Sequence, residues 1–134
     1  MTTLTTQYKG TLRTENVHTR SGSLVITDAP VDNQGKGEAF SPTDLVCTAL
    51  SSCMLTTMGI LADRENINIK GLQTEVVKIM GSAPRKISEI QISLSHPSLQ
   101  ATEVQKQKLR NAALTCPVAL SLHESIKQTV VFNF

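Results

Sequence analysis

The stretch that decides the fold runs from Ser41 to Ile60 and reads SPTDLVCTALSSCMLTTMGI. Ser41 is a good helix N-cap and Pro42 suits the first helical position, so we expect a helix to begin here. Asp44 falls in the first turn, where a negative charge is favoured by the helix dipole. The pattern continues to about Arg64, with apolar side chains over most of the circumference. Such a helix is expected to be buried.

Length and composition indicate one ordinary globular domain. The chain has 134 residues, of which 40% are hydrophobic and 18% are charged. This length suits one domain and is short for two, so we predict a single domain over residues 1–134. A chain of this size leaves much of its apolar surface uncovered as a monomer. The buried helix therefore predicts that a second subunit helps to cover it.

Strand-like segments flank the helix on both sides. Residues 5–20 and 22–30 are rich in Thr, Val, Ile and Tyr, which favour strands, and a loop over 28–40 leads into the helix. Two further strands, two helices and a closing strand are expected beyond it, at 72–79, 87–97, 102–115, 117–126 and 129–134. Residues 87–97 alternate apolar and polar side chains, as a half-buried strand does. The order of the elements predicts an α+β fold rather than alternating βαβ units.

Charge and composition argue against several classes of partner. The net charge of +2 and the four aromatic residues, three Phe and one Tyr, give little basis for binding nucleic acid. The N-terminus lacks the apolar core of a secretory signal, so we expect a cytoplasmic protein. No apolar run approaches the ~20 residues that span a bilayer, so we predict no membrane partner.

The three cysteines are the main candidates for chemistry. They form no CxxC pair, and none of His18, His96 and His123 stands at ligand spacing from a cysteine. We therefore expect no metal site and no cofactor. Cys116 precedes a proline at a predicted helix start, where free N–H groups and the dipole stabilise a thiolate. From its position alone, Cys53 is interpreted as a small buried core residue.

Residues 41–76 resemble the central signature of the family of osmotically inducible protein C (OsmC) and organic hydroperoxide resistance (Ohr) proteins. That signature has a proline, acidic residues and Leu, an Ala-rich helix ending in a cysteine, a long helix and a glycine before a strand. A second family cysteine lies in a Cys-Pro dipeptide, and the family's aromatic-Lys-Gly strand start is similar to YKGTL here. The residues that keep the register are Pro42, Asp44, Leu45, Ala49, Cys53, Cys116 and Pro117.

The resemblance implies an OsmC-like fold: N-terminal antiparallel strands, a long buried central helix, further strands, two C-terminal helices and a final strand, in an intertwined homodimer. It also implies a thiol-dependent peroxidase that reduces organic hydroperoxides in oxidative-stress defence. Cys53 is then the peroxidatic residue and Cys116 the resolving one, and an external dithiol reduces the disulfide between them. The implied partners are a second copy, a small hydroperoxide and a dithiol reductant.

The chain also departs from the family pattern. Members commonly place an arginine, held by a glutamate, against the reactive thiolate. Arg13 is the best match to that arginine and Arg20 a weaker alternative. The glutamate position after Pro42 is occupied by Thr43, and the neighbouring Asp44 is shorter. An alternative function is therefore an OsmC-like dimer that binds a small apolar ligand or senses oxidants without turnover. Cys47 matches no family site and is interpreted as a core residue.

Overall fold

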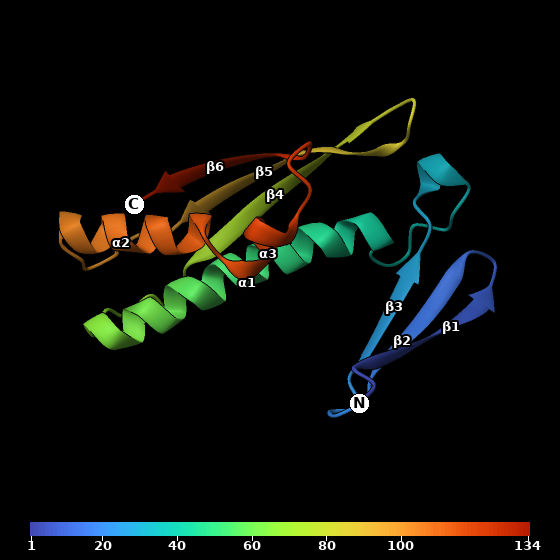
Figure 1. Ribbon diagram of the computed structural model, residues 1–134, viewed down its shortest axis with the longest axis horizontal. Helices are drawn as coiled ribbons and strands as arrows, with labels where there is room; N and C mark the ends of the chain where they lie inside the picture. Colours follow the sequence, from blue (N-terminus) through green and yellow to red (C-terminus); the bar gives the residue numbers. More distant parts are fainter. The chain divides into compact units, whose positions relative to one another are not determined.

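The computed structural model describes all residues from 1 to 134, which form six strands and three α-helices in the order shown in Figure 1. The chain divides into two compact units, Met1–Val46 and Cys47–Phe134, which are described in turn. The elements are β1 (Leu4–Gly10), β2 (Arg13–His18), β3 (Leu24–Asp28), a 3₁₀ turn η1 (Val31–Asn33), α1 (Pro42–Glu65), β4 (Gln73–Gly81), β5 (Lys86–Ser95), α2 (Glu103–Leu114), α3 (Pro117–Ser121) and β6 (Lys127–Asn133).

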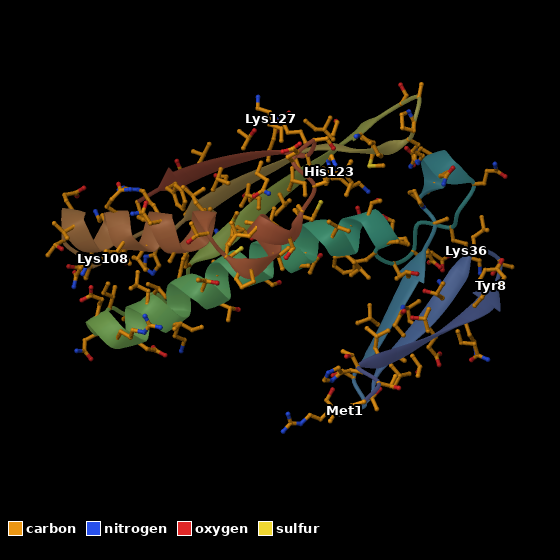
Figure 2. All side chains as sticks on the ribbon, viewed as in Figure 1. Met1, Tyr8, Lys36, Lys108, His123 and Lys127 are labelled. Atoms are coloured by element: carbon orange, nitrogen blue, oxygen red, sulfur yellow. The ribbon has the colours of Figure 1, made fainter.

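The first unit contains an antiparallel sheet in the order β1-β2-β3. A two-residue loop joins β1 to β2, and both of its residues have positive φ, 53° at Thr11 and 63° at Leu12. Tyr8 on β1 closes this hairpin, because its hydroxyl accepts a hydrogen bond from the Leu12 N–H at 3.3 Å (Figure 2). In the neighbouring pair of strands, Arg13 stands directly opposite Asp28.

The start of α1 is capped as the sequence predicts. The Ser41 hydroxyl accepts a hydrogen bond from the Asp44 N–H at 3.1 Å, and the Asp44 carboxylate accepts one from the Ser41 N–H at 2.9 Å. This reciprocal arrangement is a capping box, with aspartate in the place usually held by glutamate or glutamine. Asp44 therefore serves the helix start, and α1 ends at Glu65, one residue beyond the predicted Arg64.

The second unit contains a sheet in the order β4-β5-β6, in which β4 and β5 are antiparallel and β5 and β6 are parallel. The alternation predicted for residues 87–97 is confirmed, because Ile90, Ile92 and Leu94 are fully buried and the intervening residues face the other side. The helices run along one side of this sheet (Figure 1). The core between them is aliphatic, and its α1 members include Leu50, Met54, Met58 and Ala62.

The last two helices differ in how well their lengths were predicted. For α2 the prediction is close, and Thr102 caps it in a second capping box with Gln105. The helix predicted over 117–126 is wrong in length, because α3 ends at Ser121. Leu122 has extended backbone angles, φ −74° and ψ 146°, so the helix cannot continue. A turn closed by a hydrogen bond from the Ile126 N–H to the His123 carbonyl then leads into β6.

Helix α1 corrects the expectation that no apolar segment is long enough to span a bilayer. It has 24 residues, and its most apolar 18-residue window has a mean hydropathy of 1.8, which is sufficient by length and composition. A single such helix is weak evidence for a membrane protein, because the core helix of a soluble protein passes the same test. Parts of its surface, including Ala49, Thr56 and Ile60, are exposed in the single chain.

Candidate functional site

Two cysteines that are distant in the sequence come together in the second unit. Cys53 lies in the middle of α1, and Cys116 is the N-cap residue of α3. The Cys53 thiol lies close enough to Cys116 to raise the pKa of the Cys116 thiol, and neither cysteine is in a disulfide. The fold therefore makes neighbours of two thiols that are far apart in the sequence. Cys47 is buried in the core, as predicted, and takes no part in the pair.

The surroundings of Cys116 follow from its place at a helix start. Pro117 occupies the first helical position, and the Cys116 sulfur accepts a hydrogen bond from the Ala119 N–H at 3.4 Å. Burial raises the pKa of the Cys116 thiol, an effect that exceeds the lowering by the N–H groups of Ala119 and Val118. The predicted helix start is confirmed. The predicted stabilisation of a Cys116 thiolate is wrong, because the fully buried sulfur loses more hydration than two N–H groups restore.

The two thiols differ in their access to solvent. Cys53 is half-buried, whereas Cys116 is fully buried. The helix around Cys53 is regular, and the Thr57 hydroxyl donates a hydrogen bond back to the Cys53 carbonyl at 2.8 Å. Cys53 is therefore the more accessible residue of the pair, and Cys116 is shielded from reagents in solution.

Arg13 lies in the first unit, in a network of two carboxylates. Its Nε and Nη2 atoms donate to the two oxygens of Asp28 at 2.7 and 2.8 Å, and Nη2 also reaches Glu38 at 3.2 Å. The bidentate pair fixes the plane of the guanidinium group. Asp28 is fully buried, and the hydrogen-bonded guanidinium lowers the pKa of the Asp28 carboxyl and is itself held in the charged form.

The sequence did not predict Asp28 and Glu38 as the partners of Arg13, because the family pattern places the carboxylate beside Pro42. Thr43 contacts the Ser41 hydroxyl instead, at 3.2 Å. The signal for Asp28 is the register of β2 and β3, which places it opposite Arg13. Arg20 is exposed in the turn after β2. Of the two candidate arginines, Arg13 is therefore the one that the structure holds in a fixed orientation.

The histidines have local roles in turns. His18 pairs with the Ser21 hydroxyl, and the rings of His96 and His123 accept hydrogen bonds from the N–H groups of the serines two residues later. His123 lies in the segment between α3 and β6 (Figure 2). The structure contains no group of three or more histidine, cysteine or acidic side chains that could hold a metal ion.

The comparison with protein families gives a match over most of the chain. Residues 35–131, which include both cysteines of the pair, match the family described as OsmC-like protein. The chain belongs to the OsmC-like family. The family resemblance and the α+β fold expected from the sequence are therefore confirmed. A search of curated proteins finds no match to this member of the family.

Solved structures support the same assignment. An osmotic stress induced and detoxification response protein of Psychrobacter arcticus is 49% identical, with a TM-score of 0.95 over 99% of this chain and 96% of the other. An OsmC-like protein of Mycoplasma pneumoniae is 17% identical, with a TM-score of 0.80 over 97% and 94% of the two chains. An organic hydroperoxide resistance protein of Legionella pneumophila is 13% identical, with a TM-score of 0.77 over 100% and 97%. The last two show the shared fold alone.

Proposed function

We propose that this OsmC-like protein is a thiol-dependent peroxidase that reduces organic hydroperoxides. The observation that carries the proposal is the proximity of Cys53 and Cys116, with the first residue half-buried and the second fully buried. The name of the Legionella relative, an organic hydroperoxide resistance protein, suggests the class of substrate. We also propose a cytoplasmic location, where thiols are kept reduced between catalytic cycles.

The difference in burial between the two thiols supports an order of reaction. The Cys53 thiolate attacks the O–O bond of the hydroperoxide and takes one oxygen, and the alkoxide leaves as an alcohol after gaining a proton. Cys53 is then a sulfenic acid. The Cys116 sulfur attacks the Cys53 sulfur and displaces water, which leaves a disulfide. Cys116 is suited to this second role because it is buried beside Cys53 and shielded from the hydroperoxide in solution.

An external dithiol completes the cycle. One of its sulfurs attacks the accessible Cys53 sulfur and displaces Cys116, and its second sulfur then displaces Cys53 as the dithiol becomes a disulfide. The attack falls on Cys53 because Cys116 has no exposed surface. The cycle consumes one hydroperoxide and one dithiol and produces one alcohol, one water molecule and one oxidised dithiol.

We propose that Arg13 activates the Cys53 thiolate, a role taken from the family resemblance. The support within the first unit is its fixed, permanently charged guanidinium, which Asp28 and Glu38 orient. A cation near a thiol lowers the thiol pKa and increases the thiolate fraction. We further propose that the protein is a homodimer, because only 33% of the apolar window of α1 is buried within the single chain and the family resemblance implies a dimer.

The proposal is tested by turnover of tert-butyl hydroperoxide with a dithiol in excess. The wild-type protein is expected to consume many equivalents. Cys53→Ser is expected to consume none, and Cys116→Ser is expected to turn over more slowly, because the dithiol must then reduce the Cys53 sulfenic acid directly. Cys47→Ser, a cysteine outside the pair, is the matched control and keeps wild-type turnover. Equal consumption by wild type and Cys53→Ser overturns the proposal.

One observation favours the alternative of an oxidant sensor. Arg13 carries one positive charge and is paired with two carboxylates, so its net effect on a thiolate is weakened. A weakly activated Cys53 suits a protein that forms its disulfide once and signals through it. A single equivalent of peroxide consumed in the presence of dithiol, with the disulfide persisting, supports the sensor over the peroxidase.

A further inference from the structure

Gln128 places an amide on the covered face of the second sheet. It lies on β6 opposite Ile90 of β5, which is fully buried, so its side chain points toward the helices. The Gln128 Nε2 donates a hydrogen bond to the carbonyl of Ala119 on α3 at 3.0 Å. This bond ties α3 to the sheet at the turn that carries Cys116.

The Ala119 carbonyl needs such a donor because α3 is too short to provide one. The last carbonyls of a helix have no N–H partner within the helix. In α3 the Val118 carbonyl accepts from the Leu122 N–H, and the Pro117 carbonyl accepts from the Ser121 hydroxyl. The chain turns away after Leu122, and the Gln128 amide takes the place of the next helical N–H at Ala119.

The same residue also contacts the candidate site. Ala119 is 8% exposed, and its N–H donates to the Cys116 sulfur while its carbonyl accepts from Gln128. Hydrogen bonds therefore link the Gln128 amide through Ala119 to the sulfur of Cys116, and the Cys116 thiol lies beside that of Cys53. The hydrogen bond from Gln128 to Ala119 therefore fixes the turn that carries the buried Cys116 thiol.

We propose that Gln128 is a positioning residue for Cys116 and sets how the oxidised Cys53 is resolved. The proposal rests on the proposed peroxidase chemistry. Cys53 sulfenic acid has two fates: Cys116 converts it to a disulfide with loss of water, or a second hydroperoxide oxidises it to sulfinic acid and leaves as an alcohol. Holding the Cys116 sulfur beside Cys53 favours the first fate. Loss of the Gln128 hydrogen bond lets α3 move and favours the second.

The test uses Gln128→Met, which keeps the length of the side chain but cannot donate. Thr129→Val is the matched control, because it removes a side-chain hydrogen bond, to Glu89, from the next residue of the same strand on the opposite face. Each variant is treated with increasing cumene hydroperoxide, without reductant. Intact mass spectrometry then measures the ratio of disulfide to sulfinic acid, and stopped-flow measures the loss of the Cys53 thiol and the later formation of the disulfide.

For Gln128→Met we expect disulfide formation to slow about fivefold, equivalent to about 1 kcal/mol, with sulfinic acid appearing at lower peroxide. The first step, oxidation of Cys53, keeps its wild-type rate. Thr129→Val is expected to match wild type in both steps, even if its stability to urea is lowered as much. A wild-type ratio of disulfide to sulfinic acid in Gln128→Met overturns the proposal.

Gln128→Glu provides a second variant that separates positioning from general destabilisation. The protonated carboxyl can donate to the Ala119 carbonyl, whereas the carboxylate cannot. The rate of disulfide formation in Gln128→Glu, relative to wild type at the same pH, is therefore expected to recover as the pH is lowered. Gln128→Met is expected to show no such recovery. Absence of recovery in a folded Gln128→Glu protein contradicts the proposal. A wild-type protein that forms no disulfide with peroxide instead contradicts the proposed function.

Discussion

The half-buried Cys53 lies beside the fully buried Cys116, and neither thiol is in a disulfide. Each sulfur lies on a helix, one within α1 and the other at the first position before α3. The pair is therefore already assembled before any oxidant arrives. The difference in burial between Cys53 and Cys116 divides the chemistry between the two sulfurs.

The first prediction concerns alkylation of the reduced, native protein. Iodoacetamide is expected to modify Cys53 first. Cys116 is expected to react at roughly a tenth of the Cys53 rate or slower, because the Cys116 sulfur is buried and its pKa is raised. Peptide mass spectrometry after timed quenching gives the order. All three cysteines are expected to react in denaturant. Faster labelling of Cys116 than of Cys53 in the native protein contradicts the assigned roles.

The second prediction concerns stability in alkali. The pKa of Cys116 is raised in the folded protein above its unfolded value of about 8.5, so its contribution to stability is fully present below that pH. It is lost as the pH rises through the folded pKa, because the unfolded chain releases its proton first. The free energy of unfolding in urea is therefore expected to fall between pH 8 and pH 10, roughly. Cys116→Ala is expected to remove this fall. An unchanged pH dependence of the free energy of unfolding in Cys116→Ala contradicts the prediction.

The third prediction concerns stability in acid. The pKa of Asp28 is lowered by its hydrogen-bonded partner Arg13, so the stabilisation is present above the unfolded value of about 3.9 and is lost as the pH falls through the folded pKa. Asp28→Asn is expected to unfold at a lower temperature at neutral pH and to lose part of this acid dependence. Circular dichroism melts across the acid range measure both effects.

Glu38→Gln is the matched control for that ion pair. Glu38 also contacts Arg13, but its side chain is 66% exposed, whereas that of Asp28 is fully buried. Exposed ion pairs contribute little because water screens them. Glu38→Gln is therefore expected to change the melting temperature much less than Asp28→Asn. Equal effects of the two substitutions disagree with a buried, bidentate Arg13–Asp28 pair.

The fourth prediction concerns the loop between β1 and β2. Thr11 and Leu12 both have positive φ, which costs about 1–2 kcal/mol for each residue with a Cβ. Asn-Gly is the preferred pair for such a hairpin loop. The double substitution Thr11→Asn with Leu12→Gly is expected to raise the free energy of unfolding by about 1 kcal/mol. Thr11→Val keeps the branched side chain and is expected to give no gain.

Local rules predicted much of the fold. The cap at Ser41 depends on residues within one turn, and the alternation in β5 depends on a two-residue period that one buried face imposes. The family register then separated Cys53 from Cys47, which periodicity alone could not do, because both lie on an apolar helix. The length of α3 was overestimated because nothing local marks Leu122 as the end of a helix.

The features that could not be predicted depend on contacts between distant residues. The partners of Arg13 follow from the register of β2 against β3 and from the path of the next loop. The pKa of Cys116 depends on how much of the chain covers its sulfur, and a helix-start rule ignores that covering. Nothing in the sequence marks Gln128, because its hydrogen bond to Ala119 depends on where α3 ends.

The most direct test of the central claim is the product formed from one equivalent of organic hydroperoxide. Intact mass spectrometry of the reduced wild-type protein should show a loss of about 2 Da, with the disulfide mapped to Cys53 and Cys116. Cys116→Ser should gain about 16 Da at Cys53, and Cys53→Ser should keep its mass. Unchanged wild-type mass, or oxidation confined to residues other than Cys53, would contradict the assignment of this pair as the peroxide-reducing site.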